Sequence, residues 1–232
     1  MQGSEIILEL QKVPEFKILQ QKLADYADNF RIVGGAIRNI LGKQEITDID
    51  FAANLNPTEL VNLFNKLNIK NIPTGIEHGT ITIVIDKKNF EITSLREDVE
   101  TFGRHAKVTF SKDWEQDAKR RDFTINAIYL DFSGKIYDYH SGQKDLANNL
   151  LKFIGDAQQR IIEDYLRILR LFRFAAYLPN AQIEPDSLKA AIKLKSHLHN
   201  LSIERVQTEL WKLLAAPNFL EIVNLLAKHK IL

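Results

Sequence analysis

Residues 33–51 constrain the fold more than any other stretch of the chain. A glycine pair, Gly34-Gly35, closes an apolar segment, and two aspartates, Asp48 and Asp50, follow on either side of an isoleucine. In an extended strand alternate side chains share a face, so we expect both carboxylates to point the same way while the isoleucine enters the core. The stretch therefore predicts a strand that presents two acids on one face.

Two carboxylates held this close repel each other unless a cation lies between them. Mg2+ takes oxygen ligands in proteins, usually one or two carboxylates together with substrate phosphates. The glycine pair offers backbone N–H groups without side chains, and the helix predicted to follow it favours anions at its N-terminus. Asp48 and Asp50 therefore indicate a Mg2+ site for a phosphorylated ligand, although an isolated Asp-x-Asp pair also occurs in solvated turns and helix caps.

A third acid is predicted to join this pair. Clean apolar alternation in residues 80–85 and 90–95, on either side of the polar turn 86–89, predicts a β-hairpin. Glu91 lies in the second strand of this hairpin. It is either exposed to solvent or, if that strand lies next to the aspartate strand, the third carboxylate of a metal site.

The remaining pattern divides the chain in two. Sheet-forming sequence gives way to helical sequence near residue 145, and the net charge changes from −3 in residues 1–145 to +4 in residues 146–232. We therefore predict an α/β (α+β) fold with two domains, 1–145 and 146–232. The basic second part either faces a polyanion or carries an ordinary solvated surface. Smaller predicted elements are a strand at 30–33, a helix at 36–41 that Gly42 ends, a helix from Asn56 to Leu67, and a mobile loop at 96–118.

Composition narrows the class of protein. The chain has 232 residues, of which 45% are hydrophobic and 26% charged, as in soluble globular proteins. No apolar run is long enough to span a bilayer, and the N-terminus lacks the layout of a signal peptide. The absence of cysteine excludes disulfides and thiolate metal sites and is compatible with the cytoplasm, which is the expected location.

The order of these features resembles the polymerase-beta-like nucleotidyltransferase superfamily and, within it, the class II (bacterial-type) CCA-adding tRNA nucleotidyltransferases and poly(A) polymerases. This resemblance implies a head with a mixed sheet, followed by an all-helical neck. It covers roughly residues 30 to 214 and rests on five ordered motifs: Gly34-Gly35-Ala36-Ile37-Arg38 with Asp48 and Asp50; Arg120-Arg121-Asp122 with Asn126; Asp138 to Gly142 with Asp145-Leu146; Glu163 to Arg170; and Glu204 to Leu210.

The resemblance assigns a role to each motif. In the family the first binds the triphosphate, through Gly34, Gly35 and Arg38, and the two catalytic metal ions, through Asp48 and Asp50. The second recognises the ribose, and the third is the hinge between head and neck. The fourth reads the base of the incoming nucleotide, and the fifth supports the fourth. The residues implied for ribose recognition are Arg120, Arg121, Asp122 and Asn126.

The fourth motif implies a protein template for the incoming base. Asp164 and Arg167 are three residues apart, so we expect them on one helix face. A carboxylate acceptor, Asp164, beside a guanidinium donor, Arg167, matches cytosine and adenine. Both bases present an exocyclic amine next to a ring-nitrogen acceptor. An ordinary surface ion pair is the alternative for these two side chains. Arg170 and Arg173 continue the three-residue spacing, which suits either a phosphate-facing stripe or a solvated face.

The implied reaction is attack by the 3′-hydroxyl of tRNA on the α-phosphate of CTP or ATP, with two Mg2+ ions as cofactors. Two alternatives remain within the enzyme class: a poly(A) polymerase and a partial CC- or A-adding enzyme. Residues 73–80 resemble CCA-type relatives, and the long segment 96–118 argues against CC-only enzymes. A non-catalytic RNA- or nucleotide-binding module is the alternative from another class.

Three departures from the family pattern motivate that last alternative. Asn39 stands where relatives usually have aspartate, and Phe102 replaces the acid of the loop motif within Glu100-Thr101-Phe102-Gly103-Arg104. Relatives also continue through body and tail domains that grip the tRNA. We therefore expect either a truncated chain or a second polypeptide that supplies the missing grip.

Overall fold

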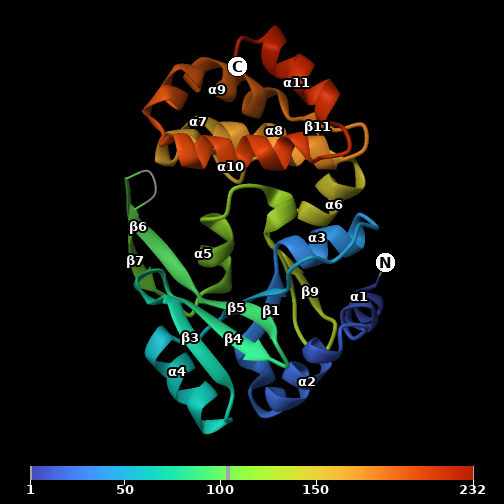
Figure 1. Cartoon of the computed structure of the whole chain (residues 1–232), viewed down its shortest axis with the longest axis vertical. Helices are drawn as coiled ribbons and strands as arrows, with labels where there is room; N and C mark the ends of the chain where they lie inside the picture. The colour runs from blue at the N-terminus through green and yellow to red at the C-terminus, as the bar shows by residue number, and fades with distance from the viewer. Residues whose placement is uncertain (1, 103–104, 232) are drawn as a thin grey trace. The chain divides into compact units, whose positions relative to one another are not determined.

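A computed structural model of the chain describes residues 2–102 and 105–231 (Figure 1). The described chain forms two compact units, and each is built from several segments because the chain passes between them more than once. The first unit comprises residues 2–99, Val108–Arg121 and Asn126–Gln143; the second comprises residues 100–102 and 105–107, Asp122–Ile125 and residues 144–231.

A seven-stranded mixed sheet forms the framework of the first unit, with the strand order β3-β4-β5-β2-β1-β8-β9 (Figure 1). Strand β2 pairs in parallel with β5, whereas the other described pairs of this sheet are antiparallel. The strands are β1 (Phe30–Val33), β2 (Asp50–Ala53), β3 (Lys70–Gly75), β4 (Thr80–Ile85), β5 (Lys88–Ser94), β8 (Ile128–Leu130) and β9 (Ile136–Asp138).

Helices of the first unit bury their apolar faces together with this sheet in one hydrophobic core. Phe51 of the central strand β2 stacks on Phe16, with the ring centroids 6.2 Å apart, and meets Phe90 edge to face. The helices and 3-10 turns are α1 (Gly3–Leu10), α2 (Pro14–Lys22), η1 (Ala24–Asn29), α3 (Gly35–Leu41), α4 (Pro57–Lys66), η2 (Ile76–His78) and α5 (Trp114–Lys119).

Several local predictions are confirmed. The strand at 30–33 is β1, the helix that Gly42 ends is α3, and Asn56 caps α4 through a hydrogen bond from the Glu59 backbone N–H. The predicted hairpin is β4–β5, with a shorter turn than expected because Lys88 already pairs with Ile85. Its two turn residues, at 86 and 87, have φ values of 45° and 74°, the conformation that suits the right-handed twist of paired strands.

Two predictions about the sheet are wrong. Strand β2 begins at Asp50, so Asp48 is not part of the predicted strand and lies exposed in the segment before it. The segment 96–118 is not an irregular loop. It forms a second sheet from β6 (Arg96–Phe102) and β7 (His105–Phe110), followed by α5, whose first N–H groups bond to the side chain of Asp113.

The second unit is mainly helical, as predicted, and its long helix α8 packs against α7, α10 and α11. It also contains a short parallel sheet, β10-β11, which periodicity did not indicate because each strand has only two residues. The elements are β10 (Leu150–Leu151), α7 (Ala157–Glu163), α8 (Arg167–Tyr177), β11 (Gln182–Ile183), α9 (Pro185–Leu194), η4 (Lys195–Asn200), α10 (Ile203–Leu214) and α11 (Phe219–Lys228), while η3 (Thr124–Asn126) and α6 (Gly142–Ala147) lie where the chain passes between units.

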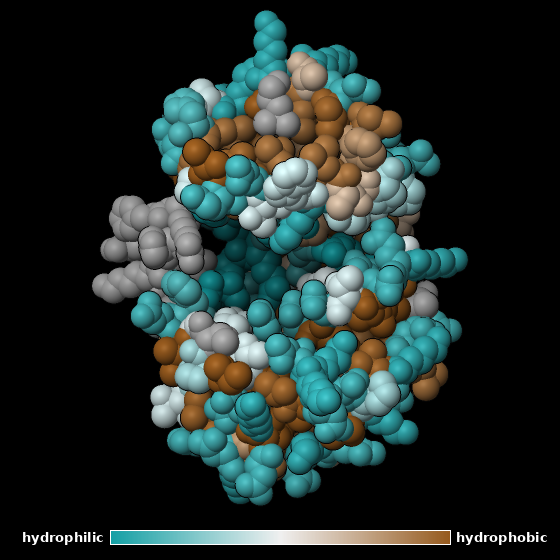
Figure 2. Space-filling model, in the orientation of Figure 1, coloured by the Kyte–Doolittle hydropathy of each residue, from teal (hydrophilic) through white to brown (hydrophobic). Residues whose placement is uncertain are grey.

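Exposed apolar side chains gather on α10 and α11 of this unit. They are Ile203, Trp211, Leu214 and Leu220, with 69%, 70%, 45% and 65% of their surface exposed. Figure 2 shows apolar surface on the face that carries these helices. The helices themselves are short, at 12 and 10 residues, and across the described ranges no helix has both the length and the hydropathy needed to cross a membrane.

The turn before β4 allows a direct test of the contact between Gly79 and Phe110. Gly79 has a φ of 80°, and a Cβ built on it would lie 2.7 Å from Cε1 of the Phe110 ring. Gly79→Ala should therefore lower the free energy of unfolding by about 1–3 kcal/mol, through backbone strain and the steric clash. Urea denaturation measures this change. In a Phe110→Ala background the same substitution should cost less, and an unchanged cost would contradict the contact.

Candidate active site

Asp50 and Glu91 lie side by side because β2 and β5 pair in parallel with these two residues in register. Residues in register on parallel strands point to the same face of a sheet. The next residues, Phe51 and Ile92, are buried in the core, so the two carboxylates point away from it. A cavity of about 220 Å3 adjoins them and is also lined by Val33, Phe51, Thr80, Thr93, Arg96, Arg120 and Arg121.

The electrostatics of Asp50 fit a cation site. Burial, followed by the charges of Glu91 and Asp48, raises the pKa of Asp50 from its ordinary value to about 6, although Arg121 acts in the opposite direction. The ionised form is therefore disfavoured by the fold itself. A divalent cation held by oxygen ligands would remove this penalty, because it stabilises the charged carboxylate.

The three carboxylates do not form a complete metal-ligand cluster. Over the part of the chain that the structure describes, no three acidic or histidine side chains come together closely enough to hold a metal ion. Asp48 is exposed before β2 and acts on Asp50 through its charge. Asp48, Asp50 and Glu91 therefore remain proposed ligands.

The glycine pair places bare backbone next to positive charge. Gly34, which precedes α3, has a φ of 77° and a ψ of −126°, a conformation that essentially only glycine adopts. A Cβ built on Gly34 would lie 3.9 Å from Nη1 of Arg121, and one on Gly35 would lie 3.7 Å from Nη2 of Arg38. Backbone N–H groups beside two guanidinium groups suit the phosphates of an anionic ligand.

Two asparagines hold the Arg38 guanidinium. Asn39 Oδ1 accepts from Nε and Nη2 at 3.2 and 2.8 Å, and Asn126 Oδ1 accepts from Nη1 at 2.6 Å. Asn39 also donates through Nδ2 to the Glu45 carbonyl at 2.9 Å, which an aspartate could not do. Asn39, the departure from the family pattern, thus orients Arg38 without adding a negative charge beside it.

Arg120 and Arg121 share one acid that the sequence reasoning missed. Asp117 is fully buried and forms ion pairs with both arginines, at 2.6 Å to Arg120 and 3.1 Å to Arg121. Burial alone would raise the pKa of Asp117, but Arg121, Arg120 and a hydrogen bond from Tyr129 together lower it. The spacing of three and four residues to the arginine pair is the sequence signal that indicates this contact.

Asp122 follows the two arginines directly, but its hydrogen bonds lie within the second unit. It belongs to the second unit, where Oδ1 accepts from the Phe123 backbone N–H and Oδ2 accepts from Nε of Arg170 at 2.9 Å. The chain passes from one unit to the other between residues 121 and 122, and the role of Arg120, Arg121 and Asp122 in ribose recognition stays a prediction. Asp122 and Arg170, predicted in separate motifs, are instead partners.

The prediction that Asp164 and Arg167 share one helix face is wrong, whereas their role in reading the base stays a prediction. Asp164 follows α7 with extended backbone angles, φ −154° and ψ 105°, so α7 ends before it and α8 begins only at Arg167. Asp164 Oδ2 accepts from Nη2 of Arg205 on α10 at 2.8 Å. Nη1 of Arg167 donates to Glu163 at 2.6 Å and to the carbonyl of Arg160 at 2.7 Å.

The arginines farther along α8 face acids as well. Nε of Arg173 donates to Glu209 at 2.5 Å, and Arg170 contacts Glu209 in addition to Asp122. Only 12% of the Arg173 side chain and 31% of the Arg170 side chain are exposed. The α8 arginines therefore form a partly buried ion-pair network within the second unit, and not a solvated stripe.

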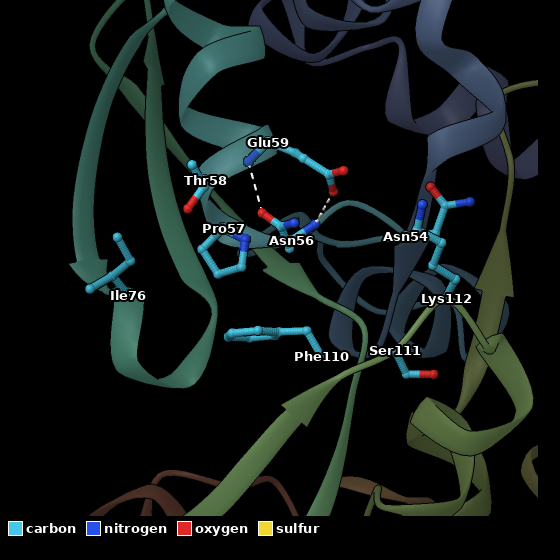
Figure 3. A pocket seen from close by; sticks show the side chains of 9 residues that line it. All are labelled: Asn54, Asn56, Pro57, Thr58, Glu59, Ile76, Phe110, Ser111 and Lys112. Atoms are coloured by element: carbon cyan, nitrogen blue, oxygen red, sulfur yellow. Dashed lines mark hydrogen bonds between the residues drawn. The ribbon is translucent and has the colours of Figure 1, made fainter.

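A larger cavity of the first unit, about 610 Å3, lies away from the paired carboxylates (Figure 3). It adjoins Asn54, which follows the end of β2 opposite to Asp50. Figure 3 shows the Phe110 ring beside Pro57, and the dashed lines mark the reciprocal capping bonds of Asn56 and Glu59. Its one carboxylate, Glu59, is thus occupied in a helix cap, and the acids that suit phosphate chemistry lie in the smaller cavity.

Comparisons with known proteins identify the family of the chain. Residues 30–152 match the family described as "Poly A polymerase head domain", and residues 180–232 match "Probable RNA and SrmB-binding site of polymerase A". The chain belongs to the class II CCA-adding enzyme and poly(A) polymerase family. The resemblance inferred from the ordered motifs is thereby confirmed, together with the mixed α/β head.

Similar members of this family are CCA-adding enzymes. The mitochondrial CCA tRNA nucleotidyltransferase 1 of Homo sapiens is 44% identical over 199 residues, which cover 84% of this chain and 46% of that protein. The structure of the Bacillus stearothermophilus CCA-adding enzyme in complex with CTP has 33% identity and a TM-score of 0.82, covering 93% of this chain and 51% of that one. A tRNA nucleotidyltransferase complexed with a primer tRNA and an incoming ATP analog has 29% identity and a TM-score of 0.73, covering 88% and 58%. The chain thus spans about half the length of these family members.

The raised pKa of Asp50 can be measured directly. In metal-free buffer, carboxyl 13C NMR should give a pKa near 6 for Asp50, and Glu91→Gln should lower it without restoring the ordinary value, because burial is the largest cause. Asp86→Asn, in the exposed β4–β5 turn, is the control and should leave it unchanged.

The same shift makes stability depend on pH. The folded pKa of Asp50 is raised above its unfolded value, so ionisation of this group destabilises the fold, and its contribution falls as pH rises from about 4 to about 6. Asp50→Asn should remove this component of the pH dependence. A wild-type Asp50 that titrates at its ordinary pKa would contradict the electrostatic account.

Proposed function

We propose that this chain is the catalytic head and neck of an enzyme that adds CMP and AMP, from CTP and ATP, to the 3′ end of tRNA. The observation that carries the proposal is the cavity in which Asp50 and Glu91 face Arg120 and Arg121, in a chain that belongs to the CCA-adding family. We retain the division into a head, residues 1–145, and a neck, residues 146–232, as part of this proposal.

The proposed cofactor is Mg2+, held by Asp48, Asp50 and Glu91. Family membership implies a divalent metal ion, and the all-oxygen donor set favours Mg2+ among such ions. The chemistry that Mg2+ supplies when bound is activation of the RNA 3′-hydroxyl and neutralisation of the departing pyrophosphate. Asp50 and Glu91 contribute their charge and their fixed place at the start of β2 and within β5, and Asp48 contributes its charge from the segment before β2.

The remaining residues of the first unit position the triphosphate. The bare backbone at Gly34 and Gly35 admits close approach of phosphate oxygens, and Arg38 and Arg121 lie beside it. Phosphoryl transfer of this kind demands little covalent work from the protein, so orientation and charge neutralisation carry the rate. Asn126, which accepts from Arg38, would face the nucleotide sugar together with the arginine pair.

We assign base selection to Asp164 and Arg167, supported by Arg170. The acceptor of Asp164 and the donors of Arg167 match the edges of cytosine and adenine, whereas uracil and guanine present the opposite pattern. In the structure these side chains have protein partners, Arg205 for Asp164 and Glu163 for Arg167. Because these partners hold the two groups in fixed orientations, they act as a preorganised template once a base is present.

The tRNA itself is proposed as the nucleic-acid substrate on two grounds. One similar structure contains a primer tRNA, and residues 180–232 match a segment described as a probable RNA-binding site. A second polypeptide, which the sequence left open, has no support from the comparisons.

The direct experiment offers labelled CTP and ATP, each alone and together, to tRNA that ends before CCA. The chain should incorporate CMP first and AMP only afterwards, in the presence of Mg2+. Asp50→Asn and Asp48→Asn should lower the rate by at least about a hundredfold, because the metal-ion chemistry is lost. Asp86→Asn, which changes an exposed aspartate in a turn, should retain the wild-type rate.

The other outcomes separate the alternatives. Repeated addition of AMP without CTP would indicate a poly(A) polymerase and not a CCA-adding enzyme. Incorporation of only CMP or only AMP would indicate a partial enzyme. Calorimetric binding of ATP with Mg2+ but no incorporation into any RNA would favour a non-catalytic binding module, and near-normal incorporation by Asp50→Asn would refute the metal assignment.

A further inference from the structure

Asp117 is a fully buried carboxylate that joins the two arginines of the candidate site. Its Oδ1 accepts from Nε of Arg120 at 2.7 Å, and its Oδ2 accepts from Nη2 of Arg121 at 3.1 Å. The hydroxyl of Tyr129 donates to the same Oδ2 at 2.7 Å and accepts from Nε of Arg121 at 2.9 Å. One carboxylate and one phenol therefore fix the orientation of two neighbouring guanidinium groups.

Burying the ionised carboxylate of Asp117 costs free energy, so its cationic and hydrogen-bonding partners must offset that cost. An ionised carboxylate withdrawn from water destabilises a fold unless cations and hydrogen bonds surround it. Asp117 has no exposed surface, while 16% of the Arg120 side chain and 18% of the Arg121 side chain remain exposed. The acid is thus hidden behind the arginines, whose outer parts stay accessible.

The accessible parts of these arginines face the candidate site. Arg120 and Arg121 both line the cavity that contains Asp50. Nη1 of Arg121 also lies next to the backbone of Gly34, since a Cβ built on that glycine would be 3.9 Å from it. Asp117 itself is not among the residues that line this cavity.

The helix that carries Asp117 is firmly attached to the sheet of the first unit. Trp114, the first residue of α5, meets Tyr129 of β8 edge to face, with the ring centroids 6.0 Å apart. The Arg31 guanidinium of β1 lies 4.0 Å from the Trp114 ring centroid and 3.5 Å from that of Tyr137 on β9. Asp117 therefore holds the arginine pair to a rigid part of the fold.

We propose that Asp117 is a positioning residue, which with Tyr129 holds Arg120 and Arg121 in the orientation that receives an incoming nucleotide. This inference rests on the proposed function for its ligand. Arginine side chains that are not held in place lose rotamer entropy when they are ordered on a ligand, and a preformed pair avoids much of that loss. A purely structural acid would instead only anchor α5.

The test uses Asp117→Asn, which preserves size and removes the charge, and Tyr129→Phe, which removes only the hydroxyl. Glu115→Gln is the matched control, because Glu115 pairs with Lys119 on the exposed side of the same helix. The readouts are KM and kcat for CTP and ATP, and the arginine Nε–H signals in 15N NMR spectra recorded without nucleotide.

Asp117→Asn should raise KM for both nucleotides by at least about tenfold while kcat changes by less than about threefold. The Nε–H signals of Arg120 and Arg121 should lose their protection from exchange with water. Tyr129→Phe should shift KM in the same direction by a smaller factor, and it keeps the test decisive if Asp117→Asn fails to fold. Glu115→Gln should match the wild type.

A folded Asp117→Asn variant with wild-type KM and protected Nε–H signals would overturn the proposal. The proposal would also be overturned if Asp117→Asn and Tyr129→Phe lowered only the amount of active protein and left KM unchanged, because a purely structural role gives that result. Failure of the proposed function looks different: the wild-type chain then binds no nucleotide, while the Nε–H signals still respond to Asp117→Asn. That result would support the orientation of Arg120 and Arg121 by Asp117 and would refute a nucleotide as their ligand.

Discussion

The parallel pairing of β2 with β5 is the constraint on which the candidate site depends. Its register sets Asp50 beside Glu91, and a slip by one residue would turn one of these acids into the core. The fold thereby holds like charges together at a partly buried place and raises the pKa of Asp50 to about 6. Proteins accept such local instability mainly where a ligand relieves it, which makes this the most informative feature of the first unit.

Within each unit, acidic and amide side chains orient the guanidinium groups of arginines. Asp117 holds Arg120 and Arg121, while Asn39 and Asn126 hold Arg38. In the second unit Asp164, Glu163 and Asp122 hold Arg205, Arg167 and Arg170, respectively. The long arginine side chains are thus ordered before any ligand arrives. They therefore lose less side-chain entropy when an anionic substrate binds.

Local features could be predicted from the sequence because their causes are local. The glycine turn into α3, the Asn56 cap of α4 and the β4–β5 hairpin each follow from residues close together in the chain. The two acids of the sheet were also found, because alternation assigns a strand residue to one face. Strand pairing across the chain was anticipated only as a possibility, yet it decides that Glu91 meets Asp50.

The errors arose where distant partners compete with local ones. Asp164 and Arg167 have the spacing of a helical pair, but Asp164 has extended backbone angles and binds Arg205 from α10. Segment 96–118 shows weak periodicity, yet residues 96–102 and 105–110 pair as strands. Residues 103 and 104, at the end of the loop motif, lie outside the described part of the chain, so the expectation for them stays untested.

The central claim is that the carboxylates beside the arginine pair bind a divalent cation together with a nucleoside triphosphate. Titration with Mn2+, followed by electron paramagnetic resonance, measures it most directly. The account predicts that the chain binds Mn2+, that CTP strengthens this binding, and that Asp50→Asn abolishes the strengthening. Mn2+ binding that is indifferent to both CTP and Asp50→Asn would contradict it.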